Sequence, residues 1–234
     1  MRLACNGSTL GEIPLEEELA AVSAAGFDLV ELRAPKVAAV ADLPGLLNRH
    51  RLQAWSINSL ERAGERDLLE EARRQAAWAA SCGAPYVVCV PGTVRPGLEE
   101  AVAGLGEACR TEGAQLAFEF MGFEWSAVRT LAEALRVHTG PVVIDTFHWA
   151  LGDGDLTALA ACDPARIAVV HVNDAPSRDL SSLGDADRVL PGAGVLDLAE
   201  FYAMLRRIGF DGVYSVELFT PVTAEAAYAA MKAL

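Results

Sequence analysis

Short apolar segments rich in Val, Ile and Leu recur along the chain, and stretches rich in Ala, Leu, Glu and Arg with helical spacing separate most of them. Such an alternation is typical of a parallel sheet with crossover helices. The pattern predicts eight strands, over Leu3–Asn6, Leu29–Leu32, Gln53–Ile57, Tyr86–Val90, Gln115–Phe120, Val142–Asp145, Ile167–Val172 and Val213–Leu218. Because a closed parallel barrel has eight strands, we expect an α/β protein with a single (β/α)8 TIM barrel over residues 1–234.

Four predicted helices support this interpretation, because each ends within two residues of a glycine that can take the left-handed conformation of a helix stop. These helices are Leu15–Ala25, Glu65–Ser81, Gly97–Thr111 and Leu198–Ile208. The longest irregular segment is Ala175–Val195, between the seventh strand and its helix. A loop of this length is usually a lid or a binding loop, and a disordered insertion is the alternative.

Metal-binding side chains lie near the ends of four successive strands: Glu119, Asp145, His171 and Glu217. The carboxyl ends of parallel barrel strands open on one face, so we expect these side chains to converge. Three carboxylates and an imidazole suit Mn²⁺, Mg²⁺ or Co²⁺ and can hold Zn²⁺. Buried ion pairs or rim positions are the alternative for any one of them. No Lys or Arg lies within these strands to neutralise the carboxylates, which favours a divalent cation.

Other polar or aromatic residues near the strand ends are candidates for substrate binding: His148, Arg178, Asp174, Glu31, Trp55 and Asn58. His148 follows Asp145 by three positions, and Asp174 follows His171 by three. Each has a simpler alternative. Loop residues can face solvent, Glu31 can pair with Arg33 or Arg51, and tryptophan is common in barrel cores.

Charge and cysteine content exclude several functional classes. The chain has 32 acidic and 19 basic residues, a net charge of −13, which repels a phosphate backbone and argues against nucleic acid. Five cysteines without a CxxC pair fit a reducing compartment. The N-terminal segment does not have the pattern of a signal peptide, and no apolar run approaches the ~18 residues that span a bilayer. We therefore expect a soluble, cytoplasmic protein without a membrane partner.

Three stretches are the most specific: VVIDTFHW, VVHVNDA and RVLPGAGVLDLAEFYAMLRRIGFDGVYSVELF. In these stretches the chain resembles the xylose isomerase-like TIM barrels, a superfamily that includes ketose 3-epimerases, hydroxypyruvate isomerase, inosose isomerase and dehydratase, and endonuclease IV. The resemblance implies that Glu119, Asp145, His171 and Glu217 bind one divalent metal ion, and that the two Glu residues are acid/base groups. It also implies that His148 contacts substrate. The epimerases have an Arg six residues after the metal-binding His, where this chain has Ser177 followed by Arg178.

We therefore expect a metal-dependent isomerase or epimerase of a small sugar or keto-polyol, acting by proton transfer through a metal-stabilised enediolate between Glu119 and Glu217. A dehydratase of an inosose-like substrate on the same site and a non-catalytic metabolite-binding barrel are the alternatives. An endonuclease IV-like enzyme fits poorly, because Val90 stands where that branch has a His. Basic residues are scarce at the strand ends, and this scarcity favours a nonphosphorylated substrate. Because relatives are often dimers or tetramers, the resemblance also allows a homo-oligomer.

Overall fold

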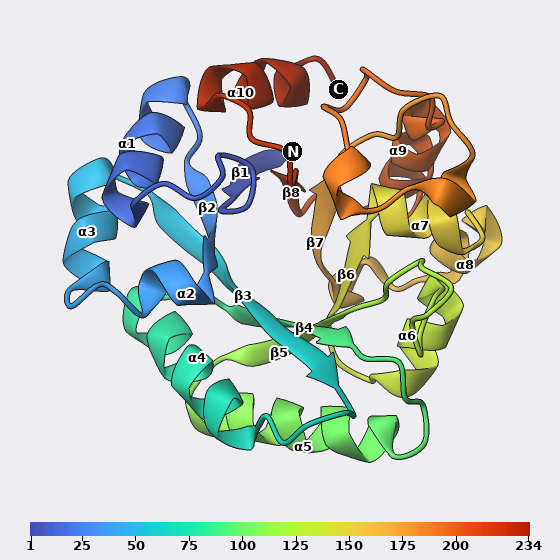
Figure 1. The fold of residues 1–234 in the computed structure, drawn as a ribbon, viewed down its shortest axis with the longest axis horizontal. Coiled ribbons are helices and arrows are strands. Elements are labelled where there is room, and N and C mark those ends of the chain that lie inside the picture. Colours follow the sequence, from blue (N-terminus) through green and yellow to red (C-terminus); the bar gives the residue numbers. More distant parts are fainter.

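In the computed structural model, which describes residues 1–234, eight parallel strands close into a barrel in sequence order (Figure 1). The strands are β1 (Arg2–Asn6), β2 (Leu29–Arg33), β3 (Gln53–Ala63), β4 (Tyr86–Pro91), β5 (Gln115–Glu119), β6 (Val142–Asp145), β7 (Ile167–Val172) and β8 (Val213–Val216). The barrel closes where β8 pairs with β1, with Arg2 opposite Val213 and Cys5 opposite Val216. The predicted (β/α)8 fold is confirmed.

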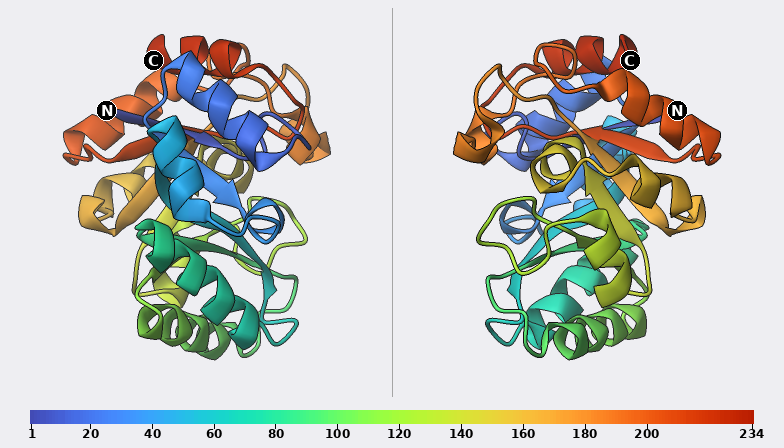
Figure 2. Two further views of the ribbon diagram at one scale, coloured as in Figure 1. Left: turned by 90° about the vertical axis from the view of Figure 1, so that its left-hand side faces the viewer. Right: turned by 90° about the vertical axis from the view of Figure 1, so that its right-hand side faces the viewer.

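Helices surround the barrel, as the two side views also show (Figure 2). They are α1 (Leu15–Ala25), α2 (Ala34–Val37), α3 (Leu43–His50), α4 (Leu69–Cys82), α5 (Leu98–Thr111), α6 (Leu131–Val137), α7 (Thr146–Gly152), α8 (Leu156–Ala161), α9 (Leu198–Arg207) and α10 (Ala224–Lys232). The four predicted helices correspond to α1, α4, α5 and α9, and Gly26 and Gly83 end α1 and α4 in the left-handed conformation. None of the helices is long and apolar enough to cross a membrane.

Strand β3 is longer than the sequence pattern predicts, because it continues from Ile57 to Ala63 through a largely polar segment. Its extension pairs with β4, with Leu60 opposite Cys89 and Ala63 opposite Pro91. This pairing holds the extension at the edge of the barrel mouth. Consequently Trp55 lies near the start of β3, although the sequence analysis placed it at the end.

The core has two layers that follow from the alternation of side chains along each strand. Small residues fill the barrel interior: Ala4, Leu29, Val88, Ala117, Val143, Ala168, Val169 and Val213. Larger residues such as Phe118 and Phe201 belong to the main cluster between the strands and the helices. The apolar filling of the interior leaves the carboxyl ends of the strands as the place where polar groups can meet.

Candidate active site

The four expected metal-binding side chains all point into the barrel because of strand alternation. Residues two positions before three of them, Ala117, Val143 and Val169, belong to the interior cluster. The period of two therefore turns Glu119, Asp145 and His171 to the same side, one layer nearer the mouth. Glu217 follows the buried Ser215 of β8 in the same way.

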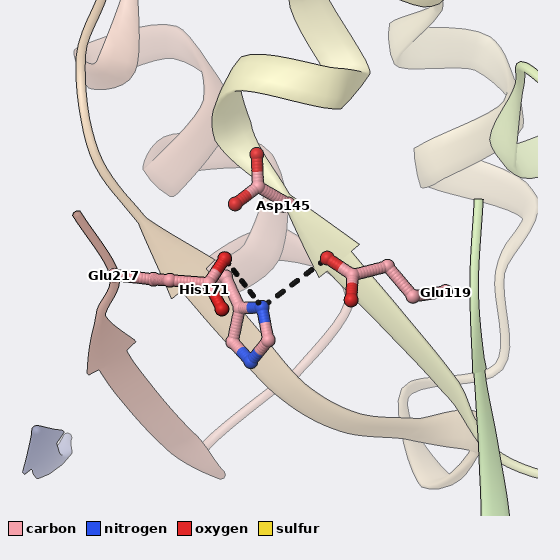
Figure 3. Close-up of side chains that lie close together, drawn as sticks. All are labelled: Glu119, Asp145, His171 and Glu217. Carbon is pink, nitrogen blue, oxygen red and sulfur yellow. Dashed lines mark hydrogen bonds and ion pairs between the residues drawn. The ribbon is translucent and has the colours of Figure 1, made fainter. Parts of the chain in front are cut away.

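Figure 3 shows how these side chains converge, with Glu119 and Glu217 on either side of His171. The possible ligand atoms of Glu119, Asp145, His171 and Glu217 all lie within 4.8 Å of one another, and all four residues are buried. His171 Nδ1 lies 3.2 Å from Glu119 Oε1 and 3.3 Å from Glu217 Oε2. Three residues distant in sequence thus meet around one imidazole nitrogen.

Asp145 is held in place by its own strand-to-helix turn. Its Oδ1 accepts the backbone N–H groups of Phe147 and His148 at 2.8 and 2.9 Å, which caps the first turn of α7. Its Oδ2 accepts a hydrogen bond from the Asn173 amide at 2.8 Å. One carboxylate oxygen is therefore fixed by the backbone, and the other faces the cluster.

Crowding shifts the proton affinities of the cluster. Burial raises the pKa of Glu119 to about 7, His171 opposes this rise, and the carboxylates of Glu217 and Asp145 add to it. Burial alone would lower the pKa of His171, but Glu217, Glu31 and Glu119 outweigh it and raise the pKa well above its usual value. These shifts reflect excess negative charge at one point. A buried set of three carboxylates and one imidazole, already convergent, fits a divalent cation.

Arg188 is a buried cation of the site that the sequence analysis missed. Its Nη1 donates to Glu217 Oε2 at 2.6 Å and lies 3.4 Å from Asp145 Oδ2. Its Nη2 contacts His148 Nε2 and Asp185 Oδ1, each at 2.8 Å. Arg188 therefore connects two of the expected metal ligands with an expected substrate ligand.

The structure does not bring Arg178 to the site. Its side chain is exposed and forms an ion pair with Asp187. An antiparallel bridge between Asp174 and Val189 returns the long loop to the barrel, so Arg188 reaches the mouth instead. The sequence feature that could have identified Arg188 is the segment RVLPGAG, in which Arg188 directly precedes Val189, the residue that pairs with Asp174.

Asp174, an expected substrate contact, organises the long loop instead. Its carboxylate is buried and accepts four backbone N–H groups at 2.8 to 3.1 Å, from Ala175, Gly192, Gly194 and Leu196. A side chain at Gly194 would overlap with Asp174, which explains the glycine there. Residues 175–195 thus form an ordered loop that presents Asp185 and Arg188 to the cavity.

Glu31 and Trp55 lie below the mouth and do not line the cavity. Glu31 is fully buried; its carboxylate lies 3.0 Å from His171 Nε2 and accepts a hydrogen bond from Ser56 Oγ at 2.6 Å. Trp55 packs against the interior cluster and donates its indole N–H to the Ala168 carbonyl at 3.0 Å. Glu31 is therefore placed to orient His171, and Trp55 is a core residue.

A cavity of about 240 Å³ opens above the carboxylate cluster. Glu119 and Glu217 line its inner end together with His148, and Asn58 lines its wall with an amide Nδ2 that has no protein partner. Burial, and then the charge of Arg188, lower the pKa of His148 well below its usual value, so its Nε2 accepts the Arg188 hydrogen bond. Trp125 and Phe219, which are partly exposed, form aromatic walls of the cavity that the sequence pattern did not indicate.

Comparison with known proteins places this geometry in a family. A family model described as xylose isomerase-like TIM barrel matches residues 19–234. The chain belongs to the xylose isomerase-like TIM barrel family. This membership confirms the resemblance expressed by the stretches around Asp145, His171 and Glu217.

Proteins with similar sequences include inosose isomerases and a 3-dehydroshikimate dehydratase. The inosose isomerase of Bacillus velezensis is 28% identical over 251 residues, which cover 94% of this chain and 89% of the relative. The 3-dehydroshikimate dehydratase of Pseudomonas aeruginosa is 27% identical over 240 residues, which cover 88% of this chain and 36% of that protein. A crystal structure of the IOLI protein with a bound zinc atom has a TM-score of 0.87 and 26% identity, and covers 100% of this chain and 96% of its own.

The Asp174 hydrogen bonds generate a test of the loop. We expect Asp174→Ala to loosen residues 175–195 while the barrel stays folded, because four backbone N–H groups lose a charged acceptor. Trypsin should then cleave after Arg178 and Arg188 at least about tenfold faster than in the unchanged protein. Asp155→Ala, which removes the N-cap of α8, is the control. Equal cleavage rates in Asp174→Ala and the unchanged protein would contradict this function of Asp174.

Proposed function

We propose that this protein is a divalent-metal-dependent isomerase or epimerase of a small sugar or keto-polyol. The observation that supports this most strongly is the convergence of Glu119, Asp145, His171 and Glu217 within 4.8 Å at the floor of a cavity. The similarity to an inosose isomerase and to a zinc-containing structure supports the same activity and a metal ion. The oxygen-rich donor set accepts Mn²⁺, Mg²⁺, Co²⁺ or Zn²⁺.

When bound, the ion stabilises the negative charge that develops on substrate oxygens as a carbon-bound proton leaves. Glu119 from β5 and Glu217 from β8 lie on opposite sides of His171 Nδ1, so they flank a substrate seated there (Figure 3). One carboxylate removes the proton and the other returns a proton. Return to the opposite face of the same carbon gives an epimer, and return to the adjacent carbon exchanges ketose and aldose.

Other residues prepare this pair for proton transfer. Arg188 contacts Glu217 at 2.6 Å, which fixes the carboxylate and favours its ionised form. Glu31 lies 3.0 Å from His171 Nε2 and would accept a hydrogen bond from Nε2–H, which would leave Nδ1 free to hold the ion. His148 Nδ1 and Asn58 Nδ2 have no protein partners and serve as donors to substrate oxygens.

A dehydratase is the second candidate, favoured by the similarity to 3-dehydroshikimate dehydratase. After the same proton abstraction, a hydroxyl group on the neighbouring carbon leaves, and the product is lighter by one water molecule. The cluster accommodates this reaction because the leaving hydroxyl can take a proton from the opposite Glu. The product mass distinguishes the two reactions.

Solvent proton exchange tests the proposed function. We expect the metal-loaded protein in D₂O to introduce deuterium next to the carbonyl group of at least one compound from a panel of ketoses and inososes. Glu217→Gln should reduce this exchange by about 10²-fold or more, because the amide cannot act as a base. Glu225→Gln, on the exposed first turn of α10, is the matched control. Full exchange in Glu217→Gln, or exchange that is insensitive to a chelator, would refute the proposal.

The proposed function of Glu31 has its own test. We expect Glu31→Gln to weaken binding of Zn²⁺ or Mn²⁺ by about 10- to 100-fold in titration calorimetry, because His171 loses the carboxylate that fixes its tautomer. Glu133→Gln, on α6 away from the cluster, should bind the ion as the unchanged protein does. Unchanged affinity in a folded Glu31→Gln protein rules out this function for Glu31.

A further inference from the structure

The outer end of the cavity contains an arginine without a protein partner. Three arginines line the cavity: Arg33, Arg62 and Arg188. Arg188 is bound to Glu217 and Asp185, and Arg62 donates to Glu65 at 2.6 Å. Arg33 makes no ion pair with the other cavity carboxylates, and its side chain takes part in no hydrogen bond within the protein. Its positive charge therefore remains available at the mouth.

The backbone and its neighbours fix the position of Arg33. It is the last residue of β2, opposite Asn58 of β3, so its side chain starts at the rim of the barrel. Its stem lies against Gly7, where an added methyl group would be only 3.1 Å from the Arg33 Cγ. Its guanidinium carbon lies 6.0 Å from the ring centre of Phe219. The stem is therefore packed against Gly7, the guanidinium lies near Phe219, and the residue lines the cavity.

Glu18 is a buried carboxylate that interacts with Arg33 through charge, but it forms its ion pair with Lys36 and not with Arg33. Lys36 forms an ion pair with the fully buried Glu18, and its Nζ also donates to the carbonyl oxygens of Gly7 and Gly11, at 3.0 and 2.7 Å. These bonds commit Lys36 and Glu18 to holding the loop after β1. Arg33 thus interacts with Glu18 only through space and is left without an ion pair of its own.

The charges divide the cavity into two ends. Glu119 and Glu217 make the inner end strongly acidic, so an anionic group of a ligand is repelled from it. Arg33 and Arg188 lie over the same ring of Phe219, at 6.0 and 4.9 Å from its centre. A small molecule whose carbonyl end sits at the carboxylate cluster and whose other end extends along Phe219 therefore comes to lie beside Arg33.

We infer that Arg33 binds an anionic group at the far end of the substrate, and that the substrate is an acidic sugar derivative with a carboxylate or a phosphate several bonds from the reacting carbon. A guanidinium group pairs with either anion through charge-assisted hydrogen bonds. In a chain with a net charge of −13, an anionic substrate needs such a local positive group. This inference rests on the proposed function, and it replaces the sequence-based preference for a nonphosphorylated substrate with a preference for an acidic one.

Matched ligands test the inference. D-tagatose, D-tagaturonate and D-tagatose 6-phosphate share a keto-sugar skeleton, as do D-fructose, D-fructuronate and D-fructose 6-phosphate. We expect titration calorimetry of the Mn²⁺-loaded protein to show at least tenfold tighter binding of an acidic member than of the neutral member of its set. If the uronate binds more tightly, the anionic group that Arg33 recognises is a carboxylate; if the sugar phosphate binds more tightly, it is a phosphate.

Three variants assign the effect to Arg33. We expect Arg33→Met, which keeps the length of the stem, to reduce the preference for the acid to within twofold, and Arg33→Lys to keep part of it. Arg62→Met is the control, because its guanidinium is already paired with Glu65, and it should keep the preference. Equal binding of acidic and neutral members in both sets, or an undiminished preference in Arg33→Met, overturns the inference.

Deuterium exchange of the same compounds separates this inference from the proposed function. Exchange without any preference for acids contradicts only the assignment of Arg33. A preference for acids that depends on Arg33, without exchange in any compound, supports the anion site and contradicts the proposed isomerase or epimerase activity.

Discussion

The mutual repulsion of three buried carboxylates is the constraint on which the rest of the site depends. Glu119, Asp145 and Glu217 are brought together by strand alternation, in a place where burial strengthens their repulsion. His171 and Arg188 each offset part of this charge through direct contacts. A divalent ion between the carboxylates would offset the remainder and would turn a destabilising cluster into a Lewis-acid centre.

The supporting structure follows from this constraint. Glu31 fixes the imidazole from below, and Asp174 folds the long loop so that Arg188 reaches Glu217 from above. The lining of the cavity includes the carboxylates of the cluster, aromatic walls and Arg33, which has no ion-pair partner. One fold thus places the proposed reactive and recognition ends in one cavity, with residues supplied by strand ends such as Arg33 and by loops at the barrel mouth.

The strands and the four converging side chains could be predicted because their signals are local. Each strand is an apolar run, and a polar residue at its end stands out in a segment such as PVVID. Arg188 could not be placed in this way, since its position depends on the pairing of Val189 with Asp174 across the folded loop. The extension of β3 was missed because Ser59–Ala63 is polar and is stabilised by pairing with β4. Short helices such as α2 and α8 have too few turns to show a clear period.

The position of a bound ion decides whether the four side chains form a metal site. Crystals grown with Mn²⁺ can be measured at the manganese absorption edge, where anomalous scattering shows the ion independently of the protein. We expect one ion coordinated by Glu119, Asp145, His171 Nδ1 and Glu217 at about 2.0 to 2.3 Å, with Arg188 beside the ligands and not between them. An ion bound elsewhere, or a cluster closed around Arg188 without an ion at saturating Mn²⁺, would contradict this expectation.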